Sequence, residues 1–201
     1  MFISTIDQHY LIPDQLIGLH KDLSQEVELE SGEDADDWFI EAMDRLLKIS
    51  DWNTLWALNG ISISLCDHHG KTTKRRAHTG DYIKLLDLKF EKVEKEYWIH
   101  IDAIEYDDYP DEDRETIALR LSPSSGPYAP KPAKSTENLP SSSATFIIER
   151  CDKKLNSLYH SRNDISTEIP EAMDIPMADS ILSWYGINDE KLNELLKALI
   201  F

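Results

Sequence analysis

Hydrophobic residues recur at helical spacing near the start of the chain. Ser31 and the acidic residues after it are typical of a helix N-terminus, and the apolar period that follows predicts a helix over about 34–49. A second, short helix is predicted at Trp52–Leu58, because the pair Asn59 and Gly60 favours a left-handed helix end.

The end of the chain carries a second helical pattern. Two helical pieces are predicted, over 177–185 and from Asp189 to Phe201, with Asn188 as the N-cap of the second. An apolar stripe runs along that second piece, made of Leu192, Leu195, Leu196, Leu199 and Ile200. Such a stripe either packs back on the chain or forms an interface, so a homodimer through the C-terminal helix is one expectation.

Between these helical patterns the period changes to two, which indicates strands. The clearest alternation begins at Trp98, and a polar turn at 152–154 joins two runs that look like a β-hairpin. The predicted strands are Ile61–Cys66, Tyr82–Leu86, Trp98–Ile104, Thr116–Leu121, Ala144–Cys151 and Leu155–His160.

The predicted elements amount to a single α+β domain over residues 1–201. We expect 1–60 to be mainly helical, with an extended lead and one helical turn before residue 30, and 61–165 to form an antiparallel sheet that could close into a barrel. Residues 122–143 are rich in proline and small polar residues, which predicts a long mobile loop. The C-terminal helices occupy 177–201.

The net charge of this 201-residue chain narrows the classes of partner. Asp and Glu number 38 against 21 Lys and Arg, which gives a net charge of −17. A field of this sign repels phosphate backbones and anionic membranes, so we expect no nucleic-acid or membrane partner and favour a basic protein. With no apolar run of spanning length and no signal-peptide pattern, the expected location is the cytoplasm.

The acidic residues gather in two clusters. Ten carboxylates and no Lys or Arg lie between Asp22 and Asp44, and the turn at 107–113 holds the second group. One interpretation is a solvated surface with acidic residues at a helix N-terminus; the other is a docking surface for a basic partner. The candidate partner-binding residues are Asp34, Asp36, Asp37, Glu41, Asp44, Asp107, Asp108, Asp111, Glu112 and Asp113.

Metal and cofactor chemistry finds little support in the sequence, and none is predicted. A calcium loop starting at Asp107 would place Glu112 where an EF-hand needs glycine. Cys66 and the histidines after it match no common zinc spacing, and the basic run at 71–76 would disfavour a cation. We expect that run to form internal salt bridges or a contact with an acidic surface.

No nucleophile or nucleotide-binding motif is present, so no catalytic residue is assigned. His160 lies close to Asp164 in the sequence, and a histidine near a carboxylate can perform acid–base chemistry, although a histidine at a hairpin end is more often structural. A face of the sheet around His100, Asp102 and His160 is therefore the alternative site, for a small ligand or a hydrolase-like reaction.

Three short motifs carry a family resemblance. They are 78–84 (HTGDYIK), the strand 144–148 (ATFII) followed by 160–164 (HSRND), and Gly186-Ile187 before the last helix. Over about residues 78–201 the chain resembles an uncharacterised family of bacterial β-rich domains. The resemblance implies a bacterial origin and brings no activity or catalytic residue.

Three functional hypotheses follow from the sequence. The first is a non-enzymatic protein whose acidic surface binds a basic partner, as a small bacterial immunity or inhibitor protein would. The second is a small-ligand binder or hydrolase-like enzyme with a pocket on the sheet. The third is a structural component that self-associates through the C-terminal helix.

Overall fold

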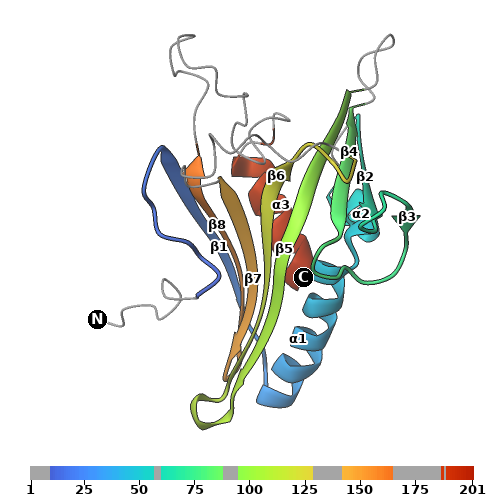
Figure 1. The fold of residues 1–201 in the computed structure, drawn as a ribbon. Helices are drawn as coiled ribbons and strands as arrows, with labels where there is room; N and C mark the ends of the chain where they lie inside the picture. The colour runs from blue at the N-terminus through green and yellow to red at the C-terminus, as the bar shows by residue number, and fades with distance from the viewer. Residues whose placement is uncertain (1–9, 57–59, 88–94, 129–141, 165–186, 188) are drawn as a thin grey trace.

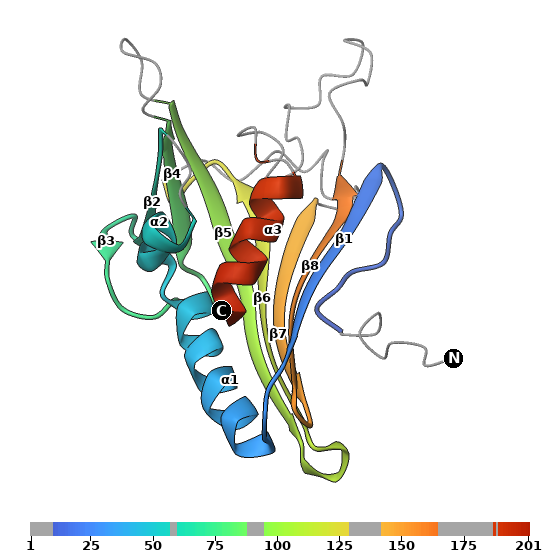
Figure 2. The ribbon, with the colours of Figure 1, turned by 180° about the vertical axis from the view of Figure 1, so that it is seen from behind.

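An eight-stranded antiparallel sheet carries helices on one of its faces in the computed structural model (Figures 1 and 2). The structure describes residues 10–56, 60–87, 95–128, 142–164, 187 and 189–201. The strand order is β1-β8-β7-β6-β5-β4-β2-β3. The predicted α+β class is thereby confirmed, but the sheet is open, with β1 and β3 as its edges, so closure into a barrel is wrong.

The strands and helices follow the alternating and helical periods of the sequence. The strands are β1 (Leu19–Glu28), β2 (Ile61–Cys66), β3 (Thr72–Thr73), β4 (Tyr82–Asp87), β5 (Lys95–Tyr109), β6 (Arg114–Ser124), β7 (Ser143–Cys151) and β8 (Lys154–Asp164). The helices are α1 (Gly32–Leu47), α2 (Trp52–Leu55) and α3 (Asp189–Ile200), with short 3-10 helices at Ile49–Asp51 and Pro110–Glu112. The Ser31 hydroxyl caps α1 by accepting a hydrogen bond from the Asp34 N–H at 3.1 Å.

The main core lies between α1, α3 and the face of the sheet that they cover, which we call the inner face (Figure 2). The apolar stripe of α3 is fully buried there within the same chain. Ser157 of β8 also anchors α3, because its hydroxyl donates to the Leu196 carbonyl at 2.7 Å. The stripe is therefore not a free surface. A homodimer through α3 would have to use other residues of the helix, and it remains a prediction.

The opposite face of the sheet, the outer face, carries a smaller apolar cluster. Leu11 packs there with Ala118, Ile147 and Leu158, which belong to β6, β7 and β8. The segment 10–17 that contains Leu11 is held by Asn163, whose side-chain oxygen accepts from the N–H groups of Leu16 and Ile17. The start of the described chain therefore folds over the sheet beside its last strand.

Strand β1 differs from the expectation of an extended lead with one helical turn. It pairs along its length with β8, so residues 1–60 contain an edge strand as well as helices. The expected loop at 122–143 begins and ends inside strands β6 and β7, and most of the rest of it lies outside the described residues. The predicted helix at 177–185 also lies outside them.

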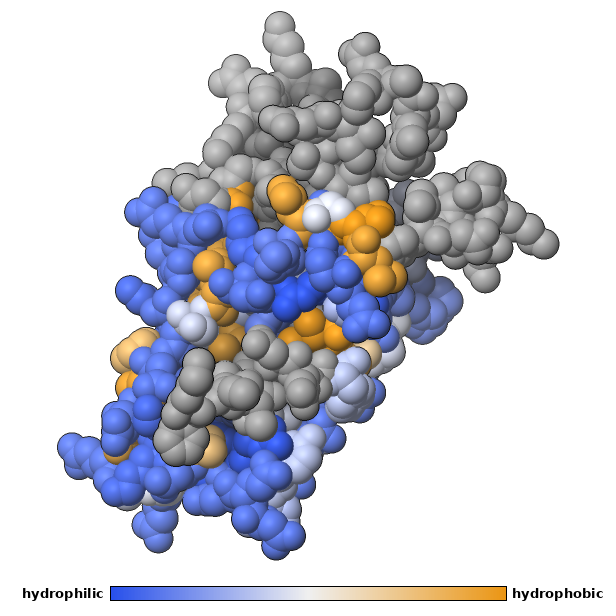
Figure 3. Space-filling model, turned by 90° about the vertical axis from the view of Figure 1, so that its left-hand side faces the viewer, coloured by the Kyte–Doolittle hydropathy of each residue, from blue (hydrophilic) through white to orange (hydrophobic). Residues whose placement is uncertain are grey.

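The side of the molecule next to β1 is mainly hydrophilic among the described residues, with hydrophobic areas that are small and separate (Figure 3). Charged residues on an edge strand oppose pairing with a further strand. In the part of the chain that the structure describes, no helix is long and apolar enough to cross a membrane.

Candidate functional site

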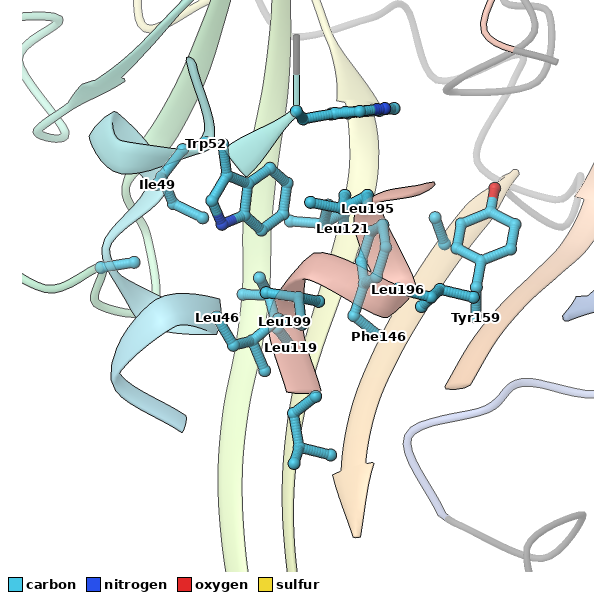
Figure 4. Packing of buried hydrophobic residues seen from close by; sticks show 14 of the residues in the cluster. Leu46, Ile49, Trp52, Leu119, Leu121, Phe146, Tyr159, Leu195, Leu196 and Leu199 are labelled. Atoms are coloured by element: carbon cyan, nitrogen blue, oxygen red, sulfur yellow. The ribbon is translucent and has the colours of Figure 1, made fainter. Parts of the chain in front are cut away.

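A row of four aromatic side chains crosses the inner layer from α2 to β8. The Trp56 ring lies 6.4 Å from that of Trp52, Trp52 lies 5.5 Å from Phe146, and Phe146 lies 5.1 Å from Tyr159, measured between ring centroids. Figure 4 shows Trp52, Phe146 and Tyr159 beside the leucines of α3. All four side chains are at most 3% exposed, so the row forms an apolar lining between helix and sheet.

The two tryptophans of this row differ in their hydrogen bonding. The Trp52 indole donates its N–H to the Arg45 carbonyl at 3.1 Å, which ties the end of α1 to α2. The indole N–H of Trp56 is buried and has no partner among the described residues. A buried donor without an acceptor costs about 1–3 kcal/mol.

At the other end of the row, Tyr159 carries a hydroxyl group into the same apolar layer. Burial, and then the nearby Asp164 carboxylate, raise the pKa of this phenol far above its usual value. The hydroxyl therefore stays protonated and can donate a hydrogen bond at any physiological pH.

The aromatic row thus combines apolar surface with two hydrogen-bonding groups, the Trp56 indole N–H and the Tyr159 hydroxyl, within the main core. The sequence predicts a helix at 52–58 but does not single out Trp56 or Tyr159. The available signal was the spacing of Trp52 and Trp56, which puts two indoles on one side of a helical turn.

The structure brings the two acidic clusters together. Asp36 of α1 and Asp113 of the β5–β6 turn both bind Arg150 of β7, each at 2.8 Å. Arg150 also pairs with Glu115 at 3.0 Å, and its own side chain is only 8% exposed. We call this end of the molecule, where the start of α1 meets the β5–β6 turn, the acidic end.

Several of the predicted partner-binding carboxylates form pairs within the chain. Asp44 pairs with Arg76 and Lys48, Glu41 with Arg45, and Glu112 with Arg114. The Asp34 carboxylate accepts from the Ser31 hydroxyl at 2.6 Å.

The remaining four predicted partner-binding residues differ in their exposure to solvent. Asp37, Asp108 and Asp111 are exposed. Asp107 is partly buried near Tyr10, whose pKa is raised to about 12 by burial and then by Asp107 and Glu105.

The alternative site around His100, Asp102 and His160 does not form as one cluster. His100 Nδ1 lies 2.7 Å from Asp102 Oδ1 on β5, whereas His160 Nδ1 lies 2.6 Å from Asp22 Oδ1 at the β1–β8 pair. Two strands, β6 and β7, separate the histidines, and both lie on the outer face rather than in an inner pocket. The two histidines therefore share the outer face without forming one cluster, and a site there that uses both of them with Asp102 remains a prediction.

The basic run at 71–76 forms internal salt bridges, as expected. Arg75 pairs with Asp81 at 2.6 Å and Arg76 with Asp44 at the same distance. Cys66, which the sequence places beside histidines as a possible zinc ligand, is buried, and its sulfur lies 3.8 Å from the Thr72 hydroxyl. Among the described residues, no three His, Cys, Asp or Glu side chains are placed to hold a metal ion.

No family model and no curated protein matches this chain. Similar solved structures include a hypothetical protein from Helicobacter pylori, at 12% identity and a TM-score of 0.49, over 92% of this chain and 87% of that chain. A Mycobacterium smegmatis protein has 12% identity and a TM-score of 0.42, over 94% of each chain. Truncated norcoclaurine synthase from Thalictrum flavum has 13% identity and a TM-score of 0.37, over 93% of this chain and 95% of that chain. Similarities of this size carry no activity over to this chain.

Proposed function

We propose that this protein binds a small, mainly apolar molecule that carries a hydrogen-bond acceptor, at the Trp56 end of the aromatic row. The observation that carries the proposal is the buried indole N–H of Trp56, which has no acceptor in the part of the chain that the structure describes. A carbonyl or hydroxyl oxygen on the ligand would satisfy that donor, while the apolar body of the ligand would contact the aromatic row.

The proposed selectivity follows from the cost of the unpaired donor. A ligand without an acceptor leaves the indole N–H unsatisfied, whereas a ligand with one gains about 0.5–1.5 kcal/mol, or roughly two- to tenfold in affinity. The Tyr159 hydroxyl offers a second contact. The protein would therefore prefer ketones, alcohols or esters over hydrocarbons of equal size.

Fluorescence titration with prodan, an apolar naphthalene that carries one ketone, tests this proposal. We expect saturable binding with a blue shift of prodan emission. Trp56→Phe should weaken binding by roughly two- to tenfold, because it keeps an aromatic ring but removes the N–H donor. Trp38→Phe is the matched control, because Trp38 is 38% exposed on α1, and it should leave the affinity unchanged.

Two results would contradict the proposal. One is the absence of saturable prodan binding by the native chain. The other is an equal affinity of the Trp56→Phe, Trp38→Phe and native proteins. Tyr159→Phe, which removes only a hydroxyl, provides a second test of the same lining if Trp56→Phe does not fold.

The acidic end supports a second candidate function, the binding of a basic protein, as an immunity or inhibitor protein would. The observation that favours it is that Arg150 holds the two acidic clusters next to each other, while Asp37, Asp108 and Asp111 are exposed there. A concentrated negative field accelerates encounter with a basic surface and weakens with added salt.

A lysine-rich peptide titrated at low and high salt tests the second candidate. Replacing Asp37, Asp108 and Asp111 with Asn should weaken binding at low salt more than a matched triple change at Asp14, Asp51 and Glu190, which are exposed elsewhere. Equal losses in the two triple variants would mean that only net charge matters, and this candidate would then be rejected.

A further inference from the structure

Three polar atoms without partners lie close together on the outer face of the sheet. Arg120 Nε, Ser143 Oγ and His160 Nε2 are each buried and have no hydrogen-bond partner among the described residues. Their side chains point outward because the residues next to them in each strand belong to the inner core: Leu121, Ala144 and Tyr159.

The strand register makes these three residues neighbours. Thr145 of β7 pairs with Arg120 of β6 on one side and with His160 of β8 on the other, and Ser143 lies two residues from Thr145 on the same face. Because adjacent strands are about 4.8 Å apart, the backbones of Arg120 and His160 are about 10 Å apart. Thr145 between them is buried, and its hydroxyl donates to the Leu11 carbonyl at 3.2 Å, so a molecule that contacts all three side chains would lie beside segment 10–17.

His160 is held in one orientation at this place. Its Nδ1 lies 2.6 Å from Asp22 Oδ1, and its side chain is 4% exposed. The same carboxylate oxygen accepts from Arg162 Nη1 at 2.6 Å, so the charge of Asp22 is matched by Arg162. The Nε2 atom of His160 is therefore left for another partner.

Arg120 is similarly incomplete. Its Nε lies 3.9 Å from Asp102 Oδ2, which is too long for a hydrogen bond. The other oxygen of Asp102 is already in contact with Ser122 and His100, each at 2.7 Å. A guanidinium N–H thus faces a polar neighbourhood without a bonded acceptor, although guanidinium groups favour carboxylate and phosphate oxygens.

We propose that Arg120, Ser143 and His160 form a binding site for a small molecule that bears a carboxylate. The guanidinium and the serine hydroxyl donate to the carboxylate oxygens, and His160 Nε2, whose Nδ1 faces the Asp22 carboxylate, accepts from a neighbouring hydroxyl of the same molecule. Native proteins seldom leave several buried polar atoms unpaired at one place, and an absent ligand accounts for all three.

This site is independent of the proposed apolar ligand site. The outer and inner sites lie on opposite faces of the sheet and share no residue. Loss of prodan binding in Trp56→Phe leaves the outer site untouched, and loss of carboxylate binding leaves the aromatic row untouched, so the two proposals fail separately.

NMR titration of the isotope-labelled full chain with sodium acetate, against sodium chloride at equal ionic strength, tests this proposal. We expect saturable shifts of the Arg120 Nε–H and His160 Nε2 signals with acetate only. Arg120→Lys keeps the charge but removes the guanidinium, and it should weaken acetate binding by about tenfold or more. Arg76→Lys, at a salt bridge with Asp44 away from these strands, should not change it.

Equal chemical-shift changes in acetate and in chloride would overturn the proposal. An ordered water would then be the partner of these three polar atoms. Equal acetate affinities in Arg120→Lys and Arg76→Lys would overturn it as well, because the effect would then be one of net charge. Ser143→Ala, a loss of one oxygen, should also weaken binding, and it replaces Arg120→Lys if that variant unfolds.

Discussion

Replacing Arg150 with methionine should destabilise the protein by about 2–4 kcal/mol, because this residue makes three ion pairs from a nearly buried position. Methionine keeps an unbranched side chain of similar length, so the change removes mainly the charge and its hydrogen bonds. The Arg150 guanidinium binds Asp36, Asp113 and Glu115 at 2.8, 2.8 and 3.0 Å.

The three partners should not contribute equally. The side chains of Asp36 and Asp113 are 55% and 63% exposed, so each of these pairs contributes about 0.2–1 kcal/mol. Glu115 is 21% exposed, and a charged hydrogen bond at such a site contributes about 1.5–3 kcal/mol. Glu115 keeps one partner without Arg150, because the Tyr106 hydroxyl donates to it at 2.6 Å.

Urea unfolding of single and double variants separates these contributions. The coupling between Arg150→Met and Glu115→Gln should exceed the coupling between Arg150→Met and Asp36→Asn, and 1 M salt should reduce only the latter strongly. A total cost below about 0.5 kcal/mol for Arg150→Met, or a larger coupling with Asp36 than with Glu115, would refute this account of the acidic end.

Three further changes test other parts of the fold. Asn163 has a left-handed backbone, with φ of 57°, and its side chain holds segment 10–17. Asn163→Ala should therefore lower the free energy of unfolding by about 2–3 kcal/mol and Asn163→Gly by less, and both should speed amide exchange at Leu16 and Ile17. Equal losses of stability would argue against backbone strain. Burial raises the pKa of Glu149, so its folded-state pKa lies above the unfolded one and the native protein loses stability as pH rises through that range. The stability of Glu149→Gln relative to the native protein should therefore be higher at pH 7 than at pH 4. A stability difference that does not change with pH would contradict this. The pKa of Asp22 is lowered despite burial, because Arg162 and His160 bind it, so the native protein should lose stability below about pH 4 more steeply than Asp22→Asn in acid titration.

The elements that the sequence predicted best are those with a strong period of their own. The apolar stripe from Leu192 to Ile200 predicts a helix with one buried side, and the alternation after Trp98 predicts a strand. Strand β1 was missed because only Leu23 and Val27 pack against the core, while Lys21 and Gln25 on the same face contact polar groups of α3. Its strand character depends on β8, which is far along the chain.

The candidate site was harder to predict than the fold. The acidic clusters are visible in the sequence, but Arg150, which joins them, lies between Glu149 and Cys151 at the end of a mainly apolar strand, and no sequence pattern marks it. The proposed role of Trp56 depends on the lack of an acceptor among the described residues around it, and that depends on side chains from distant strands. Hydrogen-bond satisfaction is a property of the folded neighbourhood, so no local pattern reports it.

The pairing of β1 with β8 has a consequence for how the chain acquires its structure. Leu19 pairs with Asp164 and Glu28 with Lys154, so among the described strands the first to leave the ribosome pairs with the last. Until β8 has been synthesised, β1 has no partner and α1 has no finished sheet to cover. Contacts of such long sequence separation slow folding. During synthesis, the apolar residues of β1 and α1 therefore stay exposed until β8 is available for pairing.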